Sequence, residues 1–182
     1  MEHSFKSDIS DKAEKYLQFL KDWELLISDE TDEIAILANT SAALREAFGF
    51  FWIGFYLVKN GELVLGPFQG DVACYRIRKG RGVCGTAWAE ACTQVVPDVD
   101  QFPGHIACSS LSKSEIVVPI FRGGEVIGVL DIDSDQLATF DDTDKRYLEQ
   151  LSNTLSKKLY TIIGCNKTPS VPLLPHKAEP SE

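Results

Sequence analysis

Two amphipathic stretches near the start of the chain predict helices. In residues 10–27, Ala13, Leu17 and Leu20 recur at three- and four-residue steps towards Trp23 or Glu24, and Ser10 is suited to cap the first turn. Residues 31–48 predict a second helix, because Gly49 follows the last turn as a stop signal. One face of that helix carries Ile34, Leu37, Ala38, Ser41, Leu44 and Phe48.

A continuous aromatic and β-branched run, FFWIGFYLV at residues 50–58, predicts a largely buried strand. Asn60-Gly61 is typical of a type I′ hairpin turn, so residues 62–65 are expected to return as the partner strand. The segment GPFQG at residues 66–70 breaks the strand pattern, and residues 72–77 resume it with Cys74 in mid-strand.

The second half of the chain alternates short strands with helical segments. Residues 86–91 predict a short helix, and residues 93–96 predict a strand. Residues 115–121 and 125–132 predict a hairpin across Arg122-Gly123-Gly124. A last helix is expected from Asp141 to about Ile163. Its apolar stripe, which could also serve a homodimer, is Leu148, Leu151, Leu155, Leu159 and Ile162.

This order of elements predicts an α+β fold. Strands joined by hairpins, with helices gathered at the ends of the sequence, favour a central antiparallel sheet with helices packed on it. A length of 182 residues suits one domain, which we place at residues 1–164. Residues 165–182 contain four prolines and a polar ending, and they predict a flexible tail.

Charge and hydropathy narrow the range of partners. A net charge of −9 argues against nucleic acid and against an anionic membrane surface, and it favours small cationic or zwitterionic ligands. Membrane spans need roughly 18 to 20 apolar residues in a row, and no run approaches that length. The first ten residues lack the apolar core of a signal peptide, so we expect a cytoplasmic protein.

Five cysteines in a cytoplasmic chain predict buried thiols, metal ligands or redox catalysts rather than a structural disulfide framework. Their spacing contains no C-x-x-C pair, which argues against a zinc site. Cys108 lies in a long irregular segment between strands, where sites are common. The segment GRGVCG, around Cys84, lacks the pattern of a phosphate-binding loop, and its glycines favour tight turns instead.

Side chains alternate between the two faces of a strand, and this places four further candidate site residues in two pairs. Trp52 and Tyr56 share one face of their strand, either as core aromatics or as a pocket wall. Asp131 and Asp133 likewise share a face at the end of theirs. Two carboxylates on the core side are costly without a ligand or polar partner, although a solvated strand end would also explain them.

Six blocks in register resemble the free methionine-(R)-sulfoxide reductases, a family with the GAF fold. They are FWIGFY, LGPFQG, VACYRIRKGRGVCGTA, VVPDVDQFPGHIAC, SEIVVPI and GVLDIDS, which together span roughly residues 50 to 134. The resemblance implies that Cys108 is the nucleophile and Cys74 its resolving partner, and that Cys84 is the family's third cysteine. It implies that the substrate pocket comprises Trp52, Tyr56, Glu115, Asp131 and Asp133.

The resemblance further implies a thiol-dependent reaction without a cofactor. Cys108 would become a sulfenic acid, condense with Cys74 to a disulfide, and be regenerated by thioredoxin or a similar dithiol. There are two rival readings: a non-enzymatic GAF module that binds a small ligand such as a cyclic nucleotide, and a thiol peroxidase or redox sensor that uses the same Cys74 and Cys108. From the residues alone, either Cys74 or Cys84 could resolve, and Glu115, Asp131 or Asp133 could donate the proton.

Overall fold

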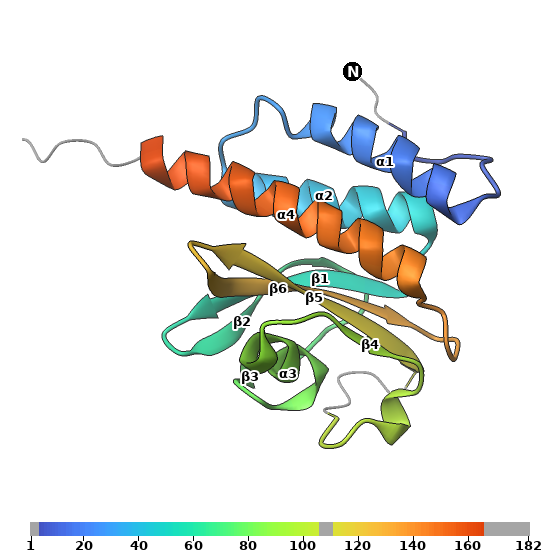
Figure 1. Ribbon diagram of the computed structural model, residues 1–182, viewed down its shortest axis with the longest axis vertical. Coiled ribbons are helices and arrows are strands. Elements are labelled where there is room, and N and C mark those ends of the chain that lie inside the picture. The colour runs from blue at the N-terminus through green and yellow to red at the C-terminus, as the bar shows by residue number, and fades with distance from the viewer. Residues whose placement is uncertain (1–3, 106–110, 166–182) are drawn as a thin grey trace, which may run out of the picture.

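The computed structural model describes residues 4–105 and 111–165 and consists of one sheet with helices on both faces (Figure 1). The elements are α1 (Lys12–Leu26), α2 (Glu33–Phe48), β1 (Trp52–Lys59), β2 (Glu62–Gln69), β3 (Arg76–Arg78), α3 (Gly82–Glu90), β4 (Gln94–Val96), the 3-10 turn η1 (Val99–Gln101), β5 (Ser114–Arg122), β6 (Glu125–Ser134) and α4 (Asp142–Cys165). The strand order is β3-β2-β1-β6-β5-β4, and all neighbours are antiparallel. The predicted α+β class is therefore confirmed.

Aspartates cap the first two helices. The Asp11 carboxylate accepts a hydrogen bond from the Glu14 N–H, so the cap of α1 is Asp11, one residue after the predicted cap, Ser10. The Asp32 carboxylate caps α2 in the same way, and Gly49, with φ of 71°, ends that helix as predicted.

The predicted buried faces of α1 and α2 are partly wrong. Leu17 and Ile34 are 55% and 52% exposed, while Tyr16, Phe19 and Ile36 are buried in their place. Apolar residues spaced three and four apart can be assigned to either of two neighbouring faces of the helix, so the spacing alone does not decide which face is buried. In α1 the larger aromatic side chains take the interior because they bury more apolar area.

Both hairpins use two-residue turns with positive φ. Asn60 and Gly61 have φ of 53° and 80°, which confirms the predicted turn. Gly123 and Gly124 form the second turn, and Arg122 already pairs with Glu125. The predicted break at residues 66–70 is wrong, because β2 continues to Gln69 past a shift in its register with β1.

The predicted strand at residues 72–77 is also wrong, since β3 is only Arg76–Arg78 and Cys74 precedes it. Two side chains of β1 donate hydrogen bonds to the backbone of the segment that precedes β3. The Trp52 indole N–H donates to the Asp71 carbonyl at 2.9 Å, and the Tyr56 hydroxyl donates to the Cys74 carbonyl at 3.0 Å. Together with the bond from the Leu65 N–H to the Tyr75 carbonyl, these bonds hold the segment around Cys74 against the sheet. The short helix α3 also starts earlier than predicted, at Gly82, and so includes Cys84.

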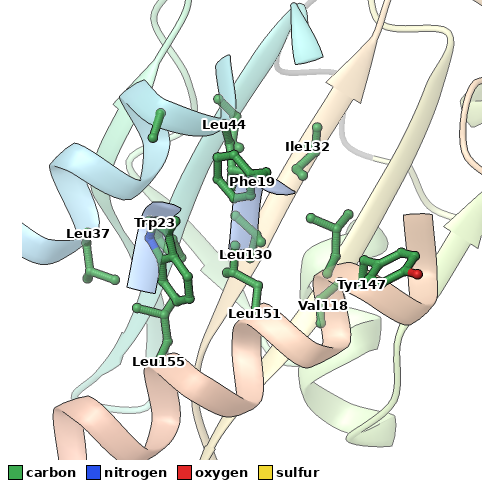
Figure 2. Close-up of a cluster of buried hydrophobic side chains, with 14 of the residues drawn as sticks. Phe19, Trp23, Leu37, Leu44, Val118, Leu130, Ile132, Tyr147, Leu151 and Leu155 are labelled. Atoms are coloured by element: carbon green, nitrogen blue, oxygen red, sulfur yellow. The ribbon is translucent and has the colours of Figure 1, made fainter. Parts of the chain in front are cut away.

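The sheet separates two apolar layers. Helices α2 and α4 pack on one face, α1 lies across these two helices on the outside, and α3 covers the other face (Figure 1). Figure 2 shows the larger layer, in which α4 lays Leu151 and Leu155 against Trp23 of α1 and Leu130 of β6. The α4 stripe is thus occupied within the chain as far as Leu159, so a dimer would need another surface. The side chain of Ile162 lies outside the described part of α4.

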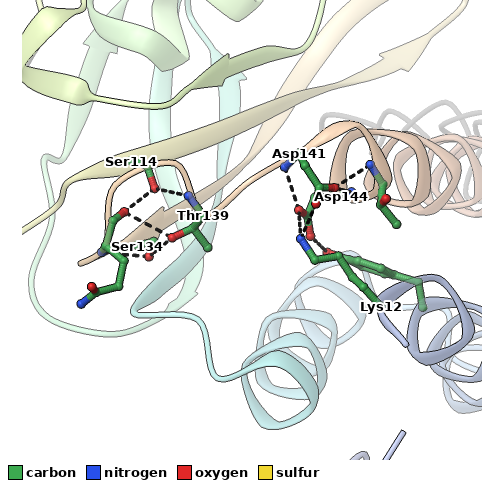
Figure 3. Close-up of polar contacts among 9 residues, drawn as sticks. Lys12, Ser114, Ser134, Thr139, Asp141 and Asp144 are labelled. Atoms are coloured by element: carbon green, nitrogen blue, oxygen red, sulfur yellow. Dashed lines mark hydrogen bonds and ion pairs between the residues drawn. The ribbon is translucent and has the colours of Figure 1, made fainter. Parts of the chain in front are cut away.

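Polar contacts fix the ends of the strands that carry the predicted site (Figure 3). The Ser114 hydroxyl donates to the Gln136 carbonyl at 2.6 Å, and Ser134 and Thr139 join their hydroxyls at 2.7 Å. Ser114 and Ser134 are themselves paired at the start of β5 and the end of β6. These bonds therefore hold the strand ends in place next to Glu115 and Asp133, the neighbours of Ser114 and Ser134.

A second polar cluster joins α1 to the start of α4 (Figure 3). Lys12 bonds Asp141 at 2.9 Å and Asp144 at 2.6 Å, and the buried Tyr16 hydroxyl donates to Asp144 at 2.9 Å. The Asp141 carboxylate caps α4, and its hydrogen bond with Lys12 lowers its pKa to about 2. None of the described helices is both long and apolar enough to cross a bilayer.

Truncating Leu151 to alanine should lower the free energy of unfolding by about 2–5 kcal/mol, because this fully buried side chain would leave a cavity between α4 and the sheet. Leu25→Ala is the matched control, since Leu25 is 68% exposed and its loss should change stability by no more than about 0.5 kcal/mol. Urea unfolding followed by circular dichroism measures both. Equal effects would contradict the assigned core.

Candidate active site

A cavity opens on the α3 face of the sheet. Its walls come from the start of β1, the segment after β2, the first turn of α3, and the adjoining parts of β5 and β6. The lining residues include the five predicted pocket residues, Trp52, Tyr56, Glu115, Asp131 and Asp133, and also Cys84, the family's third cysteine. The aromatic pair thus forms a pocket wall, and the carboxyl groups do not lie at a solvated strand end.

Strand register brings these side chains together. Trp52 pairs with Asp133, and Asp133 pairs with Glu115, so the three lie in a row across β1, β6 and β5. Directly paired residues of an antiparallel sheet point to the same face, and so do residues two apart on one strand. Asp131, which pairs with Gly54, therefore joins the row on the same face.

Two glycines make room for the Trp52 indole. A Cβ atom at Gly54 would lie 2.6 Å from the indole, and one at Gly70 would overlap it directly. The ring stacks on Phe68 with centroids 5.5 Å apart, and its N–H is bound to the Asp71 carbonyl. Trp52 is therefore held as a rigid apolar wall.

The three carboxyl groups hold their protons far more tightly than in water. Burial raises the pKa of Asp131 to about 6, although hydrogen bonds with Cys84 and Glu115 oppose the rise. Burial, followed by the charge of Asp131, raises the pKa of Asp133 to about 8 and that of Glu115 well above its usual range. The cluster therefore favours carrying fewer negative charges than three ionised carboxylates would, and Asp131, whose pKa is raised least of the three, is the group best able to hold a charge.

Cys84 is buried beside this cluster, and its thiol stays protonated. Burial, and then the charges of Asp131 and Glu115, raise the pKa of the thiol well above its ordinary value. Cys84 and Cys92 are free, whereas Cys74 is disulfide-bonded. Cys108, the predicted nucleophile, lies outside the described residues, so its predicted place beside the pocket is not tested.

The lining also includes residues that the sequence did not mark as substrate contacts, among them Arg81, His105 and Ser112. The His105 Nε2 lies 3.9 Å from a Glu115 carboxyl oxygen. Burial lowers the pKa of His105, and burial together with the charge of Asp131 raises the pKa of Glu115, so both shifts disfavour the charged forms that an ion pair would need. Ser112 bonds the Asp133 carboxyl. Arg81 lies in the turn before α3, and His105 and Ser112 lie in irregular segments. Hydrophobic periodicity cannot place side chains in such segments, so the sequence did not predict these three residues.

The fold and the position of this cavity define a GAF domain, and the GAF domain family model matches residues 30–158. A GAF domain-containing protein A of Dictyostelium discoideum is 60% identical over 79% of this chain and 92% of its own. A free methionine-R-sulfoxide reductase of Escherichia coli is 50% identical over 82% of this chain and 92% of its own.

Among solved structures, free methionine-R-sulfoxide reductase of Neisseria meningitidis in complex with its substrate superposes with a TM-score of 0.88. It is 56% identical and covers 91% of this chain and 99% of its own. The chain therefore belongs to the free methionine-R-sulfoxide reductase family of GAF-domain oxidoreductases. The family resemblance inferred from six sequence blocks is confirmed.

Replacing Asp133 with asparagine should make the folded protein more stable at pH 8. The pKa of Asp133 is raised from 3.8 to about 8 in the folded state, so the folded protein binds this proton more tightly than the unfolded chain does. The protonated carboxyl therefore stabilises the fold, and this contribution is lost as the pH rises from about 4 to 8. An asparagine stays neutral and avoids the loss. At pH 8 the variant should gain at least about 1 kcal/mol, or roughly 2–4 °C in melting temperature.

The gain should shrink as the pH falls towards 4, because the folded carboxyl is then protonated and the unfolded one is close to its own pKa of 3.8, so little of the difference between the two states remains. Thermal melts from pH 4 to 8 measure it. Asp135→Asn, which removes an exposed carboxylate from the next loop, is the matched control and should leave the pH dependence unchanged. A gain for Asp133→Asn that is constant across this range would contradict the assigned pKa shift.

Proposed function

We propose that this protein reduces free methionine-(R)-sulfoxide to methionine, using cysteine thiols that thioredoxin or a similar dithiol regenerates in the cytoplasm. The observation that carries the proposal is the buried carboxyl cluster in a cavity beside Cys74. A peptide-bound methionine has no free ammonium group to meet such a cluster, whereas the free amino acid has one.

The two ends of a zwitterionic amino acid match opposite sides of the cavity. The ammonium group pairs with the Asp131 carboxylate and its neighbours. The first turn of α3 has no side-chain cap, and Gly82 and Val83 line the cavity, so their region offers backbone N–H groups to the substrate carboxylate. Trp52 then packs against the S-methyl end.

In the proposed reaction, the Cys108 sulfur attacks the sulfoxide sulfur while an acid protonates the oxygen. The oxygen passes to Cys108 as a sulfenic acid, and methionine leaves. Glu115 suits the role of acid because burial and the charge of Asp131 raise its pKa, which favours the protonated form. The protons on Glu115 and Asp133 also limit the negative charge near Cys108, which would otherwise disfavour its thiolate.

Cys74 is the better resolving residue of the two candidates. Its thiol attacks the sulfenic acid, a disulfide forms and water leaves. The disulfide state of Cys74 supports this role, and we assign Cys108 as its partner. Cys84 is less suited because its buried thiol is held protonated beside a carboxylate, and the thiolate is the reactive form. An external dithiol then returns both cysteines to thiols.

The rival readings fit the cavity less well. A GAF module that binds a cyclic nucleotide would have to place a phosphate against buried carboxyl groups, which repel it. A thiol peroxidase would use the same cysteines but would have no need for an ammonium-binding cluster.

The full chain should consume free methionine-(R)-sulfoxide with thioredoxin, its reductase and NADPH, and Cys108→Ser should slow consumption at least about a thousandfold because the nucleophile is gone. Cys92→Ser is the control, since Cys92 is free, exposed and remote from the cavity lining. NADPH oxidation and chromatography of methionine measure the rate. Comparable rates on peptide-bound sulfoxide, or turnover of peroxide alone, would contradict the proposal.

Cys74→Ser should separate the first half-reaction from recycling. The variant should still release about one methionine per chain, because Cys108 can attack once, and then stall with thioredoxin. Rapid-quench analysis counts the methionine, and a sulfenic acid probe reports the trapped Cys108. Sustained thioredoxin-dependent cycling would transfer the resolving role to Cys84.

A further inference from the structure

Cys84 belongs to a compact group of potential metal ligands inside the cavity. Its Sγ atom and one carboxyl oxygen each of Glu115 and Asp131 all lie within 4.8 Å of one another. The three side chains come from α3, β5 and β6, so the group exists only in the folded protein. All three are buried, with exposed fractions of 3%, 6% and 7%.

Asp131 supplies a second, independent sign of a missing ligand. Its Oδ1 atom is shielded from water and has no hydrogen-bond partner among the described residues. Leaving a buried acceptor unsatisfied costs about 1–3 kcal/mol, and more for a charged one. Because Asp131 lines the cavity, a cationic occupant could meet this oxygen.

We propose that Cys84, Glu115 and Asp131 bind a divalent cation of borderline softness, with Zn²⁺ as the best match, and that the bound cation excludes substrate. One thiolate and two carboxylates, with a water in the fourth position, form a donor set that zinc accepts. Magnesium and calcium prefer oxygen ligands in larger number and gain nothing from the sulfur. The exclusion of substrate rests on the proposed function, because the cation would take the carboxyl oxygens assigned to the substrate ammonium.

The geometry requires little movement. Tetrahedral zinc holds sulfur at about 2.3 Å and oxygen at about 2.0–2.2 Å, which places its ligand atoms roughly 3.3–3.6 Å apart. The three atoms would therefore draw together by at most about 1.5 Å. Rotation of the Glu115 side chain can provide this movement, while the hydrogen bonds of Ser114 and Ser134 keep β5 and β6 fixed.

Binding exchanges protons for metal without any change in oxidation state. Zn²⁺ enters, the Cys84 thiol and the Glu115 carboxylic acid each release one proton, and Asp131 is already ionised. The charge of the site therefore stays the same, because two protons are replaced by one dication. Affinity should accordingly rise with pH, with about two protons released per ion.

The test uses oxidised full-length protein carrying Cys92→Ser and Cys165→Ser, so that Cys84 is the remaining thiol outside the proposed disulfide. Co²⁺ serves as the spectroscopic probe for the zinc site. We expect one Co²⁺ per chain, a thiolate-to-cobalt absorption band in the near ultraviolet, and loss of the band on adding one equivalent of Zn²⁺. Absence of the band, or its persistence after Cys84→Ser in this background, would overturn the site.

A second variant guards against misfolding as the cause of lost binding. Asp131→Asn keeps the shape of the side chain and should weaken Co²⁺ binding at least about tenfold, since one charged ligand is lost. Glu90→Gln, which removes an exposed carboxylate at the end of α3, is the matched control and should leave affinity unchanged. Melting temperatures confirm that each protein is folded. Equal affinity in the two variants would overturn the ligand assignment.

Competition separates the cation site from the reductase proposal. Methionine-(R)-sulfoxide added to the Co²⁺ complex should weaken metal binding in proportion to its concentration, and Zn²⁺ should inhibit reduction competitively. Cobalt binding that is unaffected by the sulfoxide would overturn the proposed exclusion. A protein without reductase activity that still binds Co²⁺ through Cys84 would refute the proposed function and leave the cation site standing.

Discussion

Three carboxyl groups share one face of two adjacent strands, where Glu115 and Asp131 are buried and Asp133 is partly buried. Removing several like charges from water is unfavourable, so the folded protein must keep protons on most of them or supply a cation. The opposite face of the same strands carries the larger apolar layer, with Leu130 and Ile132 against α4 and α2 (Figure 2). That layer offsets the cost and keeps the strands from separating.

Alternation of side chains made much of this predictable. Because successive side chains of a strand point to opposite faces, Asp131 must share a face with Asp133, and Trp52 with Tyr56, independently of how the strands pair. The Asn60-Gly61 signal correctly fixes the first hairpin. The register between strands is harder to predict, because an irregularity between Ile120 and Phe121 shifts the second hairpin and so decides which residue of β6 faces Glu115.

Contacts between distant segments account for what the sequence did not reveal. The segment around Cys74 is not a strand, and its backbone carbonyls at Asp71 and Cys74 are bonded by the side chains of Trp52 and Tyr56, which come from β1 some twenty residues earlier in the chain. Similarly, the spacing of the cysteines argued against a metal site, yet α3 brings Cys84 to two carboxyl groups from other elements. Ligands from three separate elements leave no local spacing to detect.

In the proposed reaction, the cluster couples recognition of the substrate to proton supply. With the cavity unfilled, Glu115 holds its proton tightly because it is buried and faces the Asp131 charge. An ammonium group bound against Asp131 would oppose that charge and lower the pKa of Glu115, so its proton becomes easier to give to the sulfoxide oxygen. A sulfoxide without an ammonium group would leave Glu115 a weaker acid. Selectivity for the free amino acid then follows from the rate of the chemical step as well as from binding.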